Sequence, residues 1–271
     1  MFNAQLSRKL LTLLINLCYN PAQVSNAIET LKDGFCEVYF SLFQSSLPLP
    51  LHAQVWIDFD GTISREDVLD ELVSRFACND SWKIIEERWR AGLIGSEECL
   101  RSEFSLVRVK AAELAAFLDQ IHLDPGFEPL LQILEQYNVP VTILSDGIET
   151  FIRRILTRHG LGHLTIRANR ARQHRDRLHF SCPHRNAQCA SAAAHCKCNS
   201  ANLLAQAHRR SIYIGDGRSD LCPARQADVV FAKGALAKAL STEHVPYIPY
   251  SGLTDVTMAL SNAWMTKAAV V

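Results

Sequence analysis

Apolar and polar positions alternate from residue 54 onward in a way that predicts strands and helices in turn. Three short apolar runs end abruptly in acidic or hydroxyl-bearing residues, as buried parallel strands do where they leave a sheet. Between residues 66 and 122 apolar side chains recur at helical spacing, and no strand pattern occurs. The three apolar runs are Val55–Ile57, Val141–Leu144 and Ile212–Ile214.

From residue 123 strands and helices alternate regularly, which is typical of a parallel sheet covered on both faces. The fold class expected is therefore α/β: a doubly wound parallel sheet with a Rossmann-type core and a small inserted α-helical cap. We place the core at 54–64 and 123–264, and the cap at 65–122. Helices are expected near 126–137, 148–159, 199–208, 219–226, 234–241 and 253–263, strands near 139–144, 163–167, 211–215 and 228–231, and a hairpin arm over 164–181.

Within the insertion the apolar stripes predict at most four short helices. The first stripe runs from Val68 to Phe76, and further apolar residues near 100–104 and 114–118 mark two later helices. A second apolar stripe predicts the next helix. It consists of Trp82, Ile84, Ile85 and Trp89.

Residues 1–50 are expected to form an N-terminal helical extension and linker. Leucines between Leu6 and Leu17 recur at helical spacing beside Arg8 and Lys9. A secretory signal peptide is the alternative, since a short apolar core adjoins basic residues. Polar residues at 16–20 cut that core short, which favours a docked amphipathic helix, and the run is too short to span a bilayer. Ser45–Pro50 then predicts a linker.

The charge balance limits the classes of binding partner to be expected. The chain has 271 residues, and Lys+Arg and Asp+Glu both number 28, so its formal net charge is zero and no nucleic-acid partner is indicated. Nine cysteines in a chain of this length are unlike a small secreted disulfide scaffold. We therefore expect a reduced, cytoplasmic protein without a membrane partner. Whether it forms a homodimer stays open.

The candidate chemistry lies at the ends of the expected strands. Asp58–Thr62 follows the first strand, Ser145–Gly147 the second and Gly215–Asp220 the third. The carboxyl ends of parallel strands meet at one crevice of the sheet. Carboxylates gathered there repel one another unless a cation lies among them, and Mg²⁺ prefers such oxygen ligands. The three motifs together predict a magnesium site that handles phosphate.

With these motifs the chain resembles the haloacid dehalogenase-like phosphohydrolases over roughly residues 54 to 260. The helical insertion after the first motif is similar to the branch that holds phosphoserine phosphatase. The Ser-Asp-Gly turn and the Cys-rich approach to the third motif resemble most the methionine-salvage (MtnX-type) phosphatases. The resemblance implies a Mg²⁺-dependent phosphomonoester hydrolase that forms an aspartyl-phosphate.

The substrate implied is a small-molecule phosphate ester, with an enol or keto-pentyl phosphate of methionine salvage first. A phosphocholine or phosphoethanolamine phosphatase is the alternative. A phosphotransferase of the same fold is a further alternative. A non-enzymatic binding protein is disfavoured, because the motif acids, Ser145 and Lys197 are all present.

The two acids of the first motif have separate expected roles. Asp58 would attack phosphorus as a carboxylate nucleophile. Asp60 would protonate the leaving oxygen and later activate water. Mg²⁺ would be held by Asp58, by the main-chain carbonyl of Asp60 and by Asp216. Gly61 and Thr62 are counted with the phosphate-binding residues.

The other phosphate ligands come from the later motifs. Ser145 offers a hydroxyl, and Asp146 and Gly147 complete a turn whose backbone amides can approach an anion. The family places a lysine before its penultimate helix, and Lys197 is the only Lys between Lys110 and Lys233. The six residues expected to bind phosphate are Gly61, Thr62, Ser145, Asp146, Gly147 and Lys197. Asp220 matches the family's last acid and would support Lys197 and the metal ligands.

Substrate specificity is expected to reside in the cap. Asp67 occupies the place where phosphoserine phosphatase presents a carboxylate to the substrate's amine, although a solvated or capping role is equally open. Glu103 falls where the arginine that clamps the serine carboxylate is expected, so phosphoserine is a poor candidate.

A Cys- and His-rich loop precedes Lys197. Its ligand types suit zinc, but no Cys-x2-Cys pair occurs, so a reduced cysteine cluster is favoured over structural zinc and over a disulfide. The basic stretch 167–177 is expected to be a solvated hairpin, with a rim that attracts anionic esters as the alternative. The loop residues are Cys182, His184, Cys189, His195, Cys196 and Cys198.

Overall fold

The computed structural model describes Leu47 and residues 52–189, 191–204 and 209–268. The chain divides into two compact units, residues 1–47 and 48–271, and every helix and strand of the described residues belongs to the second unit. The predictions for residues 1–50 therefore lie outside the described residues, apart from Leu47. Among the described helices, none combines the length and the hydropathy needed to cross a bilayer.

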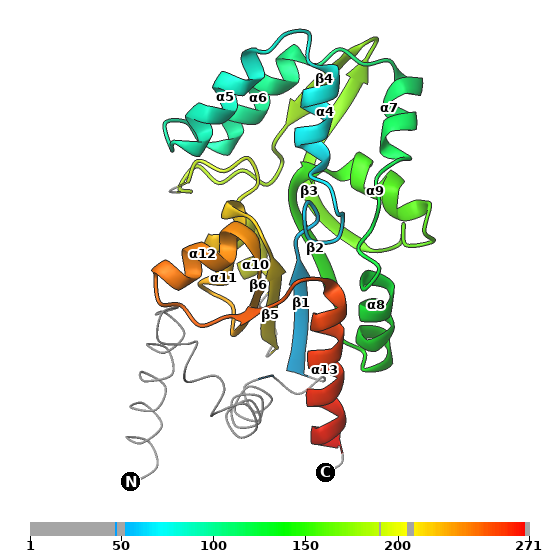
Figure 1. The fold of residues 1–271 in the computed structure, drawn as a ribbon, viewed down its shortest axis with the longest axis vertical. Helices are drawn as coiled ribbons and strands as arrows, with labels where there is room; N and C mark the ends of the chain where they lie inside the picture. The colour runs from blue at the N-terminus through cyan, green and yellow to red at the C-terminus, as the bar shows by residue number, and fades with distance from the viewer. Residues whose placement is uncertain (1–46, 48–51, 190, 205–208, 269–271) are drawn as a thin grey trace, which may run out of the picture. The chain divides into compact units, whose positions relative to one another are not determined.

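A seven-stranded sheet forms the core, in the order β4-β3-β2-β1-β5-β6-β7 (Figure 1). All neighbours are parallel except β3 and β4, which form an antiparallel arm. The doubly wound parallel sheet predicted from the sequence is confirmed, as is the hairpin. The strands are β1 (Ala53–Ile57), β2 (Val141–Ile148), β3 (Thr165–His174), β4 (Arg177–Ser181), β5 (Arg210–Gly215), β6 (Val229–Ala232) and β7 (Ile248–Pro249).

The register of the three central strands brings the motifs to one level. Every residue of β1 is buried, as expected of an apolar strand with neighbours on both sides. Ile57 pairs with Ile143 of β2 and with Ile214 of β5. The residues that follow these three positions therefore lie side by side at this edge of the sheet, although β2 continues to Ile148, past the end at residue 144 predicted from the sequence. This register places Asp58, Ser145 and Asp216 around one crevice.

Helices cover both faces of the sheet. Trp56, Tyr213 and Val230 pack on one face against α10, α11 and α12, through Ala201, Ala224, Leu236 and Leu240. Figure 1 shows α8, α9 and α13 on the opposite face. The core helices are α8 (Phe127–Gln136), α9 (Glu149–Thr157), α10 (Lys197–Leu204), α11 (Leu221–Ala224), α12 (Gly234–Thr242) and α13 (Leu253–Ala268), with a 3-10 turn at Arg218–Asp220.

Four short helices follow the first motif, as predicted: α4 (Val68–Phe76), α5 (Ser81–Arg90), α6 (Ser96–Leu106) and α7 (Ala111–Leu118). The first stripe is buried on α4. The second stripe lies on α5, as predicted, but α5 has no buried residue and Ile84 is 62% exposed. Trp82, Ile85 and Trp89 are only partly covered.

The β3–β4 arm packs against the cap helices rather than standing in solvent. Phe180 of β4 lies 5.2 Å from Phe104 of α6, centroid to centroid. The Val109 amide donates to the carbonyl of Asp176 (2.8 Å), and the Gln173 side chain donates to the carbonyl of Val109 (2.8 Å). The cap helices and the β3–β4 arm therefore pack together as one unit at this end of the sheet.

Candidate active site

Lys197 links two of the acids that the sequence singled out. It begins α10, two residues earlier than the helix predicted from the sequence, and is 2% exposed. Its Nζ lies 2.8 Å from Asp58 Oδ1 and 2.8 Å from Asp220 Oδ1. Burial alone would lower the pKa of Lys197, but the charges of Asp220, Asp58 and Asp146 outweigh it and raise that pKa. The buried lysine is therefore a fixed cation beside Asp58.

Asp220 is the most highly coordinated carboxylate of the crevice and is fully buried. Its Oδ1 accepts from Lys197 and from the Tyr213 hydroxyl (2.6 Å), and its Oδ2 accepts from the amides of Asp216 (3.1 Å) and Gly217 (3.0 Å). Burial tends to raise the pKa of Asp220, but Lys197 and these hydrogen bonds lower it. A carboxylate with this many donors positions its neighbours rather than reacting.

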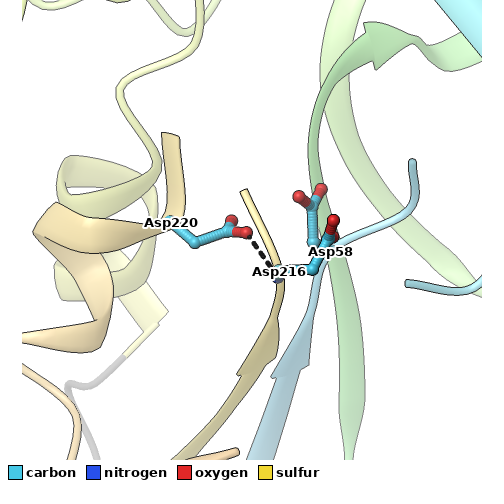
Figure 2. Close-up of side chains that lie close together, drawn as sticks. All are labelled: Asp58, Asp216 and Asp220. Atoms are coloured by element: carbon cyan, nitrogen blue, oxygen red, sulfur yellow. Dashed lines mark hydrogen bonds between the residues drawn. The ribbon is translucent and has the colours of Figure 1, made fainter. Parts of the chain in front are cut away.

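Asp58, Asp216 and Asp220 place carboxylate oxygens within 4.8 Å of one another (Figure 2). Asp216 also accepts a hydrogen bond from Thr62 Oγ1 (2.7 Å), whose hydroxyl lies 3.3 Å from that of Tyr250. Gly61 has a φ of +68°, and a Cβ there would come within 2.6 Å of Asp216 Oδ2. Only glycine fits this turn without displacing that carboxylate.

The donor set fits a hard divalent cation. Burial and the charge of Asp220 raise the pKa of Asp58 despite Lys197, and burial raises the pKa of Asp216. A cation among these oxygens would favour both ionised forms and relieve their repulsion. Oxygen ligands of this kind suit Mg²⁺. The residues present therefore fit the magnesium predicted from the sequence.

Asp60 has a different set of hydrogen-bond partners from Asp58. Its Oδ1 accepts from the amide of Val68 (3.0 Å), and its Oδ2 accepts from Ser145 Oγ (3.2 Å). Burial and the charge of Asp67 raise the pKa of Asp60 to about 8. This carboxyl group therefore carries a proton at neutral pH, as a general acid must.

Ser145 and Gly147 lie beside Asp60 in the last part of β2, so the turn predicted from the sequence is instead an irregular stretch of strand where the pairing with β3 shifts between Leu144 and Ile148. The amide of Gly147 donates to Ser145 Oγ (2.8 Å), and Ser145 is fully buried. A Cβ at Gly147 would come within 2.8 Å of Ser145 Oγ and 2.9 Å of Asp60 Oδ2. The absence of a side chain at this position is what allows the hydroxyl and the acid to share the crevice.

Asp146 and His195 hold the Cys-rich loop to this edge of the sheet. The amide of His195 donates to Asp146 Oδ1 (3.3 Å), and the His195 ring contacts the Ser145 carbonyl through Nδ1 (2.9 Å) and Ser200 Oγ through Nε2 (2.7 Å). Asn169 donates to the Asp146 carbonyl (2.7 Å). Burial raises the pKa of Asp146 to about 6 and lowers that of His195 to about 3. The neutral His195 ring therefore supports this part of β2.

Tyr213, Tyr250, Asn169 and His195 were not assigned to the active site from the sequence. Tyr213 lies inside an apolar strand, where alternation predicts only that its side chain faces a helix-covered side of the sheet. Its hydroxyl reaches Asp220 because β5 and the following turn double back on each other. That contact joins residues seven positions apart, and neither belongs to a sequence pattern that predicts it.

A cavity of about 150 Å³ joins the catalytic acids to the cap. Its wall also contains Trp89 and two cations, Lys197 and Arg218. Glu103 is only 6% exposed, and burial and the charge of Asp70 raise its pKa to about 7. The acids that line this cavity are Asp58, Asp60, Asp67, Asp70, Glu86, Glu103, Asp146 and Asp216.

Asp67 has the capping role that the sequence left open, and its role toward the substrate stays a prediction. Its Oδ1 accepts from the amides of Leu69 (3.1 Å) and Asp70 (3.0 Å), so it caps α4. It also lines the cavity and is exposed there. One carboxylate therefore fixes the start of the cap and faces the space above Asp60.

The Cys-rich loop only partly follows the grouping expected from the sequence. Cys182 lies apart, with its Sγ 3.8 Å from Arg101 Nη2. Cys189, Cys196 and Cys198 share a second cavity with Cys222, which no spacing rule includes.

Comparison with known proteins agrees with this geometry. The model of a family described as "Putative Phosphatase" matches residues 53–244. The chain is 26% identical over 206 residues to the 2-hydroxy-3-keto-5-methylthiopentenyl-1-phosphate phosphatase of Microcystis aeruginosa, covering 74% of this chain and 94% of that protein.

Solved structures share the fold. A probable phosphoserine phosphatase from Vibrio cholerae superposes with a TM-score of 0.63 at 18% identity, covering 83% of this chain and 69% of that one. A substrate-bound phosphoserine phosphatase superposes with a TM-score of 0.59 at 18% identity, covering 75% and 95%. The match over residues 53–244, most of the chain, shows that this chain belongs to the family described as "Putative Phosphatase".

Proposed function

We propose that the chain hydrolyses a small phosphomonoester with Mg²⁺ through an aspartyl-phosphate on Asp58. The observation that carries the proposal is the pairing of Asp58 with the buried cation of Lys197 (2.8 Å), in the same crevice as the carboxyl group of Asp60 with its raised pKa. A nucleophile needs to be ionised and the leaving oxygen needs a proton, and these two environments favour those states. Asp58, Asp216 and the main-chain carbonyl of Asp60 would hold Mg²⁺, which would neutralise charge on the phosphate oxygens.

The reaction proceeds in two displacements. An oxygen of Asp58 attacks phosphorus, the ester P–O bond breaks, and Asp60 gives its proton to the departing oxygen. Asp60, now ionised, takes a proton from a water molecule that attacks the phosphorus and breaks its bond to Asp58. Lys197 and the Ser145 hydroxyl bind phosphate oxygens, with the amide groups of Ser145–Gly147 beside them. Inorganic phosphate leaves, and Asp60 is protonated again.

Chelation of the metal tests the proposal directly. Purified protein should hydrolyse p-nitrophenyl phosphate, lose that activity in EDTA and recover it with added Mg²⁺, because Asp58 and Asp216 need a cation between them. The measurement is the release rate of p-nitrophenol across a Mg²⁺ titration. Undiminished turnover in the chelator would exclude the metal.

For the substrate we propose first an enol or keto-pentyl phosphate of methionine salvage, since similar curated proteins are named for such an ester. A second candidate is suggested by the cavity. On the side of the cap, the cavity is lined by Trp89 and by four acids, Asp67, Asp70, Glu86 and Glu103. Carboxylates beside an aromatic face attract a cationic head group, such as that of phosphoethanolamine or phosphocholine.

Glu103 separates the two substrate classes. Its pKa of about 7 means that it is protonated below and ionised above neutral pH. For a phosphocholine-type ester, KM should therefore fall as pH rises through about 7, and Glu103→Gln should flatten this trend and raise KM about tenfold, the effect of one lost charge contact of about 1.4 kcal/mol. For a keto-pentyl phosphate, whose organic group is uncharged, Glu103→Gln should leave KM unchanged.

The measurement is kcat and KM for both esters from pH 6 to 9 in the wild type, Glu103→Gln and Glu98→Gln. Glu98 is an exposed acid on the same helix and does not line the cavity, so its variant is the matched control. Equal KM changes in the two variants would assign the effect to the general charge of the cap. A clear preference for phosphoserine would contradict both candidates.

A further inference from the structure

The buried side chain of His195 connects the two elements that carry the phosphate-binding groups Ser145 and Lys197. It lies at the end of the Cys-rich loop, two residues before Lys197. Its Nδ1 is 2.9 Å from the carbonyl oxygen of Ser145, and its Nε2 is 2.7 Å from Oγ of Ser200. Ser145 belongs to β2, and Ser200 belongs to α10, the helix that Lys197 begins. One ring therefore joins β2 to the helix of the catalytic lysine.

The two partners of the ring fix its tautomer. A carbonyl oxygen only accepts hydrogen bonds, so Nδ1 carries the proton and donates it to Ser145. Nε2 is then an acceptor, and the hydroxyl of Ser200 donates to it. We call this series of two hydrogen bonds, from Ser200 through His195 to Ser145, the His195 chain. All three of its members are buried, so water does not replace these bonds easily.

The His195 chain acts on the part of α10 that carries the lysine. Ser200 follows Lys197 by three residues, about one helical turn along the same face. Asp58 and Asp220 hold the far end of the lysine side chain, at Nζ. The hydrogen bond of Ser200 to His195 holds the main chain from which that side chain starts. The position of the ammonium group therefore depends on both attachments.

The main chain around His195 is fixed from two sides. The amide of His195 donates to Asp146 Oδ1 of β2 (3.3 Å), and the amide of Ala194 donates to Oγ of Ser96 (3.0 Å), the first residue of cap helix α6. A ring whose own backbone is held in this way keeps its place between β2 and α10. It can therefore serve as a fixed spacer between Ser145 and Lys197.

We propose that His195 is a positioning residue, which through Ser200 holds Lys197 at the distance from Ser145 that a bound phosphate group requires. The inference rests on the proposed function in one respect, that Ser145 and Lys197 bind the same phosphate group. His195 takes no part in the reaction. It uses only the main-chain carbonyl of Ser145 and leaves the hydroxyl, which lies 3.2 Å from Asp60 Oδ2, free to contact the substrate. Loss of the His195 chain should therefore weaken phosphate binding by the folded protein.

The test measures the binding of inorganic phosphate to the full-length protein in saturating Mg²⁺, by isothermal titration calorimetry, which needs no turnover. His195→Asn keeps an amide donor near the position of Nδ1 but removes the acceptor at Nε2, and Ser200→Ala removes the donor of the same hydrogen bond. Each should raise the Kd of phosphate about tenfold, the usual effect of one lost buried hydrogen bond. The double variant should bind phosphate as weakly as either single variant and no more weakly, because all three lack the same bond.

His184→Asn is the matched control. The ring of His184 belongs to the same loop and lies 4.9 Å from that of His195, centroid to centroid, but is not part of the His195 chain. This variant should bind phosphate as the wild type does. Thermal unfolding curves of all variants show the folded fraction at the temperature of the titration. A merely structural role of His195 would lower the unfolding temperature and leave the phosphate Kd of the folded molecules unchanged.

The outcomes separate this inference from the proposed function. An unchanged phosphate Kd in folded His195→Asn and Ser200→Ala overturns the inference, and so do independent, additive losses in the double variant. Should His195→Asn fail to fold, Ser200→Ala decides alone, since it removes only a hydroxyl group. A wild type that binds phosphate but hydrolyses no ester contradicts the proposed function and leaves the inference to the measured Kd values. A wild type that binds no phosphate at millimolar concentration overturns both.

Discussion

Replacement of Asp58 by Asn should lower kcat for p-nitrophenyl phosphate by about three orders of magnitude or more, with little change in fold. The amide keeps the shape of the side chain but is a far weaker nucleophile than a carboxylate, so the aspartyl-phosphate cannot form at a useful rate. Lys197 retains its second partner, because Asp220 stays 2.8 Å from Nζ and is itself held by Tyr213. The folded structure should therefore tolerate the loss of one charge.

The measurement is steady-state kinetics beside a thermal unfolding curve for the wild type, Asp58→Asn and Asp80→Asn. The same substitution at Asp80 is the control, because that carboxylate is 81% exposed on the cap and pairs only with Lys83. Its kcat should stay within about twofold of the wild type, since an exposed pair contributes little. Residual activity above one-tenth in a well-folded Asp58→Asn would show that another residue attacks phosphorus.

The arrangement of the strand ends could be predicted from the sequence because it depends on short apolar runs. Val55–Ile57 and Ile212–Ile214 are followed by polar or glycine residues, so the ends of β1 and β5 could be located within one position. The end of β2 could not, because this strand continues four residues past Leu144 to Ile148. Parallel pairing then brings the side chains that follow these strands together, whatever the conformation of the connecting loops. The same reasoning missed β7, since a strand of two residues has no periodicity.

The surroundings of the acids could not be predicted in this way. Asp220 gains its hydroxyl partner from Tyr213, and Thr62 lies beside Tyr250, through contacts that depend on how helices and turns pack across the sheet. The exposure of α5 could not be predicted for the same reason, because it too depends on packing. An apolar stripe predicts a buried face only where a neighbour covers it, and none of the described residues buries the stripe on α5.

The Cys-rich loop shows the same limit for a candidate ligand set. Sequence spacing grouped Cys182 with Cys189, Cys196 and Cys198, because all four lie close to Lys197 along the chain. The fold turns Cys182 toward Arg101 and brings α11 against the start of α10, so that Cys222 joins instead. Residues that separate helices bring together have no fixed spacing along the chain.

Asp60→Asn should trap the phosphorylated enzyme. With p-nitrophenyl phosphate the leaving group departs without a proton, so Asp58 should still be phosphorylated. The asparagine cannot take a proton from water, and kcat should fall about a hundredfold to a thousandfold as the intermediate accumulates. The Asp60 carboxyl group has a pKa of about 8, as a general acid and base at neutral pH requires, and an amide has no ionisable proton in that range.

Rapid mixing should show a burst of p-nitrophenol that approaches one equivalent per active site, followed by slow turnover. Acid quenching and peptide mass spectrometry should locate the phosphate on Asp58, and hydroxylamine should remove it, as it does from an acyl phosphate. Ser145→Ala serves as the control, because it removes the 3.2 Å hydrogen bond to Asp60 but leaves the acid in place, so it should slow turnover without a burst. Phosphate recovered on a serine or histidine would contradict the assigned nucleophile. If both the burst and the turnover are lost, Asp60 is needed before the first displacement. Its role would then be electrostatic, as a partner of the metal, and not that of the general acid.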